Sequence, residues 1–108
     1  SASEVFIGTM QDYHRADTVG TNSYGKGIAQ YVIGLPSGAG VRYTYAQYFT
    51  AQGREVHKKG LAADYEVPWP EGLPLSDSLS GLVEKDPQLA KAVDVLQQKI
   101  MAEAEKAA

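Results

Sequence analysis

The sequence lacks cysteine, which excludes disulfide bonds and catalysis by a thiol. No apolar run approaches the roughly 20 residues that a membrane-spanning helix needs. A basic excess is also missing, since 10 lysines and arginines stand against 13 acidic residues and give a net charge of -3. That balance argues against nucleic acid as the main partner, because phosphate binding requires a positively charged face. A chain of 108 residues can form one small domain.

A helix is predicted over residues 2–13, where apolar side chains recur at steps of one, three and four residues. Ser1 precedes this helix, and Glu4 follows Ser1 by three residues. This spacing is typical of a capping box, in which the serine is the N-cap and the glutamate binds back to it. Ser1 is therefore expected to stand at a helix N-terminus.

Strands and one further helix are predicted after this point. Strands are expected at 17–20, at 28–35, at 41–50 and at the end of 57–67, with the PSGAG turn at 36–40 joining a hairpin. A proline-rich connection follows over 68–85. A helix is predicted from Asp86 as N-cap and Pro87 as first residue to residue 108, with its last turns frayed. So few elements would cover Val41 and Tyr43 poorly, which predicts that the chain is part of a larger domain.

The stretch GTNSYGK at residues 20–26 matches most of a phosphate-binding loop. Gly27 stands where that loop needs Ser or Thr, and a strand is predicted where the loop needs a helix. Nucleotide binding is therefore disfavoured. His14 and His57 have no partner at metal-ligand spacing and are interpreted as surface residues.

Lys26 lies between Gly25 and Gly27 in a tight loop. Such a loop can bury a lysine, and burial lowers a lysine pKa and makes the amine a general base. The base would need a nucleophile, and Ser1 has a favourable position because the free amides of a helix N-terminus can stabilise an oxyanion. The residues thus suggest a Ser–Lys dyad, a known variant of triad chemistry.

The segment SASEVFIGTMQDYHRADTVGTNSYGKGIAQ resembles the catalytic segment of the C-terminal processing peptidases, also called tail-specific proteases. In that family the serine opens the SASE motif and the lysine follows 25 residues later, which corresponds here to Ser1 and Lys26. Gln30 matches a glutamine that assists the dyad, and Asp12 matches a recurring supporting aspartate. His14 stands where the family usually has glycine.

The resemblance implies a serine endopeptidase that acts near the C-terminus of protein substrates. Its fold would be α/β, a crotonase-like (ClpP/crotonase) peptidase core, of which this chain is an incomplete fragment. Residues 1–67 would be the C-terminal half of that core, with 68–85 the connection and 86–108 the C-terminal helix. Lys26 would take the proton of Ser1, Gln30 would orient Lys26, and the Ala2 N–H would meet the oxyanion.

The resemblance also implies the surroundings of the chain. The partners would be substrate C-termini and an upstream half with a PDZ domain and the N-terminal core, which would supply a second oxyanion donor. The chain alone is therefore expected to be inactive. The resemblance implies no cofactor and no metal. It leaves open whether the protein forms a homo-oligomer. The location that it implies is the periplasm or cell envelope.

Three alternatives remain open at this point. In an N-terminal-nucleophile hydrolase the α-amine of Ser1 would itself be the base, which leaves Lys26, Gln30 and Asp12 unexplained. A non-catalytic module could bind peptides along an edge strand of the tyrosine-rich hairpin. Ser1 could also be a residue left over from a tag, in front of a purely structural domain.

Overall fold

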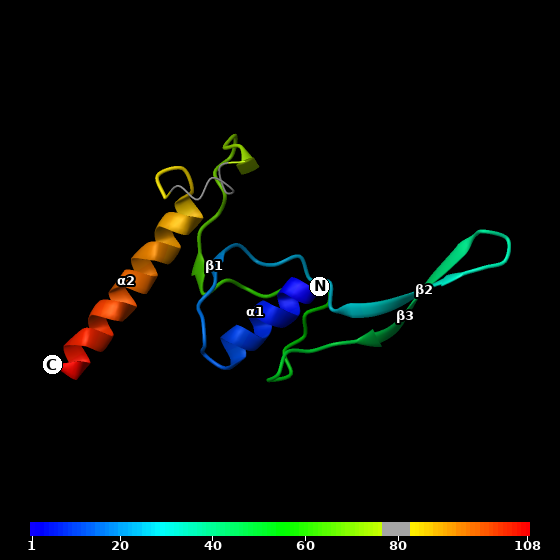
Figure 1. Cartoon of the computed structure of the whole chain (residues 1–108), viewed down its shortest axis with the longest axis horizontal. Helices are drawn as coiled ribbons and strands as arrows, with labels where there is room; N and C mark the ends of the chain where they lie inside the picture. Colours follow the sequence, from blue (N-terminus) through cyan, green and yellow to red (C-terminus); the bar gives the residue numbers. More distant parts are fainter. Residues whose placement is uncertain (77–82) are drawn as a thin grey trace. The chain divides into compact units, whose positions relative to one another are not determined.

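The structure is a computed structural model that describes residues 1–76 and 83–108. Its elements are the helices and strands labelled in Figure 1: α1 (Ala2–Asp12), β1 (Val19–Gly20), β2 (Ile28–Gly34), β3 (Gly40–Gln47), β4 (Tyr65–Glu66) and α2 (Pro87–Ala107). Each was predicted from the sequence, although β3 ends three residues early. The predicted fraying is wrong, because α2 continues to Ala107. Residues 77–82 of the predicted connection lie outside the described residues.

The chain forms two compact units. Unit 1 contains Ser1–Asp17 and Asn22–Ala62, and unit 2 contains Thr18–Thr21 and Ala63–Ala108. The short stretch 18–21 belongs to unit 2 because its strand β1 pairs with β4 far along the chain. The segments 1–67, 68–85 and 86–108 stay a prediction. The α/β prediction is confirmed at the level of two helices and small sheets.

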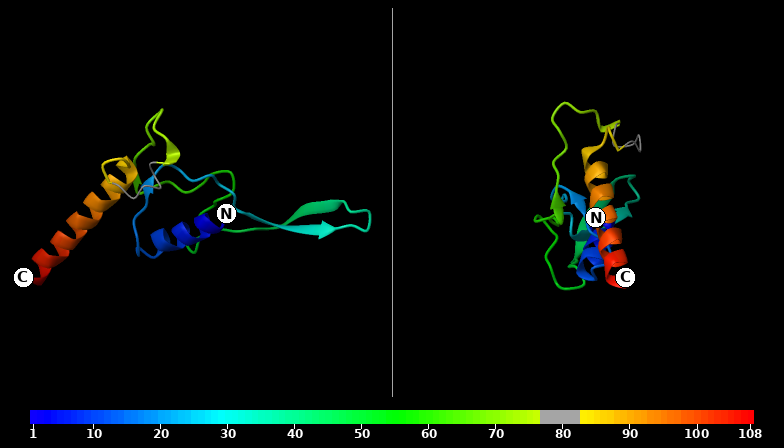
Figure 2. Two further views of the ribbon diagram at one scale, coloured as in Figure 1. Left: turned by 45° about the horizontal axis from the view of Figure 1, so that its top comes forward. Right: turned by 90° about the vertical axis from the view of Figure 1, so that its left-hand side faces the viewer.

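In unit 1, β2 and β3 form the predicted antiparallel hairpin, which Figure 2 shows as two strands side by side. Gly38 has a φ of +86° in its turn, a conformation that favours glycine. Tyr31 pairs with Tyr43 across the strands and stacks on Tyr45 with 4.1 Å between ring centroids. Tyr43 remains 43% exposed and Val41 46% exposed. The expectation that this hairpin is poorly covered within the chain is therefore confirmed.

Helix α1 begins as predicted, with Ser1 as its N-cap. The α-ammonium group of Ser1 donates to Glu4 Oε2 at 2.8 Å, an ion pair in the position of the glutamate half of a capping box. The buried face of the helix is a surprise. It consists of Glu4, Gly8 and Asp12, at steps of four residues, while the apolar Phe6 is 62% exposed. Helix α1 therefore packs on the rest of unit 1 through the side chains of Glu4 and Asp12 and through Gly8.

Unit 2 joins β1 to β4 in parallel, with Val19 opposite Tyr65. Asp86 caps α2 as predicted, because its Oδ1 accepts from the backbone N–H groups of Gln88 and Leu89, both at 2.9 Å. The Gln88 side chain in turn donates to the carbonyl of Val67 at 2.9 Å. These bonds fix the start of α2 to the chain that follows β4. Neither α1 nor α2 is long and apolar enough to cross a membrane, within the residues that the structure covers.

Candidate active site

An open groove of about 550 Å³ lies in unit 1 between the start of α1 and the base of the hairpin. Ser1, Ala2 and Val5 line it from α1, and Lys26 lines it from the loop at residues 22–27, here named the lysine loop. The rest of its lining is Ile28, Ala29, Gln30 and Val32 of β2, Arg42 of β3, and Tyr48. The groove therefore brings together the predicted nucleophile, base, orienting glutamine and oxyanion donor.

The Glu4 carboxylate links α1 to the lysine loop. Besides the Ser1 nitrogen, it accepts from Ser23 Oγ at 2.5 Å, from the Gly25 amide at 2.5 Å and from the Lys26 amide at 3.0 Å. Glu4 is only 3% exposed, so these four donors compensate for the loss of water around its charge. One buried carboxylate thereby fixes the backbone next to the serine and next to the lysine.

The pKa of Glu4 reflects this arrangement. Burial raises it, but the hydrogen bonds from Ser1, Ser23 and the two loop amides outweigh burial and lower the pKa from 4.5 to about 2. Glu4 is therefore ionised throughout the neutral and mildly acidic range. Sequence reasoning gave this residue only a capping role, because its other partners lie 19 to 22 residues away along the chain.

Tyr48 makes a second link between the same two segments. Its hydroxyl donates to the carbonyl oxygen of Ser1 at 3.0 Å and also contacts the carbonyl oxygen of Lys26. Its own amide donates to the Gly27 carbonyl at 2.9 Å. Burial, followed by the charge of Glu4, raises the pKa of the Tyr48 hydroxyl, which keeps the proton on the donor. The sequence predicted a strand over 41–50 but assigned Tyr48 no role.

The lysine loop packs backbone against backbone on the turn at residues 56–60. A Cβ atom at Gly27 would lie 2.5 Å from the backbone nitrogen of His57, and one at Gly25 would lie 2.8 Å from the nitrogen of Gly60. The Lys58 amide donates to the Gly25 carbonyl at 2.8 Å. The glycines on both sides of Lys26 are therefore required by close approach, as their placement in the sequence suggested.

The prediction of a buried Lys26 is wrong for this chain. Gly25 and Gly27 are buried, but the Lys26 residue between them is exposed and its side chain lines the groove. The physical reason is that the loop buries its backbone against the 56–60 turn, which leaves the Lys26 side chain to line the open groove. Within the described chain, the Lys26 ammonium has no hydrogen bond or ion pair.

Gln30 also differs from the prediction. Its side-chain nitrogen donates to Thr44 Oγ1 at 3.0 Å, and no hydrogen bond joins it to Lys26 in the part of the chain that the structure covers. Gln30 and Thr44 are cross-strand partners in the hairpin, so the threonine is the nearest acceptor. The amide oxygen of Gln30 keeps its lone pairs for a donor in the groove.

Comparison with known proteins identifies the family. The sequence profile described as "Peptidase family S41" matches residues 1–67, which hold every residue of the groove. The chain belongs to this family.

Individual relatives agree with this S41 assignment. A "Probable CtpA-like serine protease" of Staphylococcus epidermidis is 39% identical over 71 residues, which are 66% of this chain and 14% of that protein. A "Carboxyl-terminal-processing protease" of Picosynechococcus is 39% identical over 98 residues, which are 91% of this chain and 23% of the relative. The solved structure of a "Photosystem II D1 C-terminal processing protease" matches with a TM-score of 0.58 at 40% identity, over 68% of this chain and 19% of the other. The S41 chain thus spans less than a quarter of the length of these relatives.

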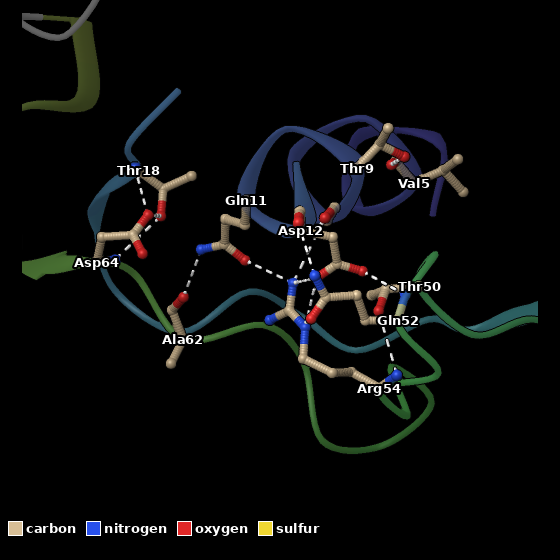
Figure 3. A network of polar contacts seen from close by, with 11 residues as sticks. Val5, Thr9, Gln11, Asp12, Thr18, Thr50, Gln52, Arg54, Ala62 and Asp64 are labelled. Atoms are coloured by element: carbon tan, nitrogen blue, oxygen red, sulfur yellow. Dashed lines mark hydrogen bonds and ion pairs between the residues drawn. The ribbon is translucent and has the colours of Figure 1, made fainter. Parts of the chain in front are cut away.

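Asp12 of this S41 chain lies at the far end of α1 and does not line the groove. Figure 3 shows it facing Arg54, whose Nη2 and Nε lie 2.6 and 2.9 Å from its Oδ1. The Thr50 hydroxyl, the Gln52 amide and Arg54 lower the pKa of Asp12 against the opposing effect of burial. A supporting role for Asp12 would therefore act by fixing α1 to the 50–54 segment.

The two histidines take no part in the groove. His14 adopts a φ of +51°, a conformation that favours glycine, at the position where the family resemblance led us to expect one. His57 packs against Gly27 through its backbone, and its Nδ1 is buried without a partner among the described residues. No group of three or more potential metal ligands occurs in residues 1–76 and 83–108.

Proposed function

We propose that this chain supplies the Ser–Lys dyad of a serine endopeptidase that cleaves protein substrates near their C-termini, within a crotonase-like peptidase core. The observation that carries the proposal is that Ser1 and Lys26, 25 positions apart, line one groove and are tied together by Glu4 and Tyr48. The names of the relatives from Staphylococcus epidermidis and Picosynechococcus support the reaction class.

The reaction follows from the groove. Neutral Lys26 takes the proton from Ser1 Oγ while Oγ forms a bond to the scissile carbonyl carbon. The Ala2 N–H is a first-turn amide without a partner inside the helix, and it receives the resulting oxyanion. When the carbon–nitrogen bond breaks, the Lys26 ammonium returns the proton to the leaving amine. Water then attacks the acyl ester, with Lys26 again acting as base, and restores the Ser1 hydroxyl.

The remaining roles belong to residues near the dyad and to chain outside it. The free amide oxygen of Gln30 would accept a hydrogen bond from Lys26 and orient the amine. A preceding peptidase segment would provide the second oxyanion donor and cover Lys26. Because the loss of one oxyanion donor costs about 10² to 10³ in rate, the 108 residues alone are proposed to be inactive. The periplasm or cell envelope is the proposed location.

Labelling with a fluorophosphonate probe tests the dyad. A longer polypeptide that carries these residues behind the preceding segment should be labelled, and Ser1→Ala should abolish the label. Lys26→Ala should lower the labelling rate by at least about 10², the usual size of a general-base contribution. Lys58→Ala is the matched control, because this exposed lysine lies next to the loop but outside the groove. Labelling at Ser1 that persists in Lys26→Ala would remove the general-base role.

A non-catalytic peptide-binding module is the competing function. The observation in its favour is that β2 and β3 each have a single neighbour within the described residues, so each offers an edge that a peptide could extend. The same labelling experiment separates the two, because a module would bind peptides and leave Ser1 unlabelled in the longer polypeptide.

A further inference from the structure

The groove carries positive charge and no negative charge. Lys26 and Arg42 are its charged lining residues, and no carboxylate lines it. Lys26 has a role in the proposed reaction, but Arg42 has none. Arg42 is exposed, and its guanidinium makes no hydrogen bond or ion pair within the described chain. An arginine without an internal partner, beside a proposed substrate groove, is available to bind a ligand.

The hairpin register fixes the position of Arg42 within the groove. Arg42 lies opposite Val32, and Thr44 lies opposite Gln30, two residues nearer the lysine loop. Since a strand rises about 3.3 Å per residue, Arg42 stands roughly 7 Å farther along the hairpin than Gln30. An extended peptide that lies along β2 covers this distance with two residues. Arg42 would therefore meet the peptide a few residues from the bond that faces Ser1.

The surroundings of Arg42 indicate what the peptide presents there. Val32 lies opposite Arg42 in the hairpin, and Val5 lines the same groove and is 51% exposed. A guanidinium matches a carboxylate with two parallel hydrogen bonds, and an exposed valine surface matches an apolar side chain. The pairing thus selects a peptide that carries a carboxylate next to an apolar residue.

We propose that Arg42 is a specificity-determining residue that binds a carboxylate of the bound peptide. The carboxylate is either an Asp or Glu side chain or the C-terminal carboxylate itself. This inference relies on the proposed peptidase function to place the peptide in the groove. Its test measures binding with the serine removed, so the result is independent of whether the dyad reacts.

The experiment is fluorescence anisotropy on the longer polypeptide that carries these residues behind the preceding segment, with Ser1→Ala and with three labelled peptides of equal length. One contains glutamate and an amidated C-terminus, the second contains glutamine and a free C-terminus, and the third contains glutamine and an amidated C-terminus. At least one of the first two should bind about 10-fold more tightly than the third, which corresponds to one well-formed charged pair. Which one it is identifies the source of the carboxylate.

Variants then assign the preference to Arg42. Arg42→Ala should bind all three peptides as weakly as the uncharged one, and Arg42→Lys should recover part of the preference, because a lysine keeps the charge but not the paired geometry. Arg15→Ala is the matched control, since Arg15 is exposed and lies outside the groove. Circular dichroism verifies that the variants fold. The proposal is overturned if the three peptides bind alike, if none binds, or if the preference survives in Arg42→Ala.

Discussion

Replacing Glu4 by glutamine should loosen the start of α1 and the lysine loop together. Glu4 Oε2 accepts from Ser1 and Lys26, and Oε1 accepts from Ser23 and Gly25. A glutamine amide has one oxygen, so its NH₂ group would face two of these donors in either orientation. The Ser1 ammonium belongs to an exposed residue, and the Ser23 hydroxyl can turn to accept a hydrogen bond. One buried amide, that of Gly25 or that of Lys26, is therefore left without a partner, which costs about 1–3 kcal/mol in Glu4→Gln.

The pH dependence gives a second estimate of the same contacts. A folded pKa of about 2 against an ordinary 4.5 corresponds to about 3 kcal/mol at neutral pH. Because the folded pKa is the lower one, this stability is fully present above pH 4.5 and is lost as the pH falls toward 2. The Glu4→Gln variant should not show this loss of folding stability as the pH falls from 4.5 toward 2. The two estimates agree within their ranges.

Amide hydrogen exchange by NMR measures the effect at the contacts themselves. A loss of about 2 kcal/mol should speed the exchange of the Gly25 and Lys26 amides about 30-fold at neutral pH. Glu55→Gln is the control, because Glu55 lies in unit 1 but forms an exposed pair with Lys59 and should leave these amides unchanged. Exchange in Glu4→Gln that matches the parent would refute the reasoning, as would an unchanged loss of stability between pH 4.5 and 2.

Two further changes test the packing of unit 1. Arg54→Lys should lower the midpoint of urea unfolding, because lysine cannot supply both the Nε and the Nη2 contact to Asp12. Circular dichroism measures this midpoint. An unchanged midpoint would contradict a stabilising role of the two contacts. Gly27→Ala should displace the lysine loop, because its Cβ would lie 2.5 Å from a backbone nitrogen, whereas Gly34→Ala meets nothing within 4 Å. Gly27→Ala should melt well below the parent and Gly34→Ala close to it. Equal melting temperatures for these two variants would rule out the close backbone contact at Gly27.

Local signals in the sequence predicted the elements well. The N-cap position of Ser1, the PSGAG turn and the Asp86–Pro87 helix start each depend on residues next to one another, and each is present. The pair of glycines around Lys26 also indicated a tight loop correctly, since atoms of residues 56–60 leave no room for a Cβ atom at either glycine.

What the sequence could not predict depends on contacts between distant segments. The buried face of α1 was expected from its apolar residues, yet Glu4 and Asp12 are buried because donors from the lysine loop and from Arg54 reach them. The spacing of four residues between Glu4, Gly8 and Asp12 was the available signal for this face. Tyr48 had no such signal, because its acceptors are backbone carbonyls and leave no pattern in the side chains.

The order of the segments along the chain limits how the protein can be shortened. Residues 18–21 belong to unit 2, yet they connect the stretch that carries Ser1 to the stretch that carries Lys26. The strand within them, β1, finds its partner β4 only at Tyr65–Glu66. A polypeptide cut after Ala62 would keep every residue of unit 1 and deprive the connecting strand of its partner. The match to the S41 profile ends at residue 67, just beyond β4. The shortest polypeptide that keeps the pairing of β1 with β4 must therefore extend through β4, although every residue that lines the groove lies before it.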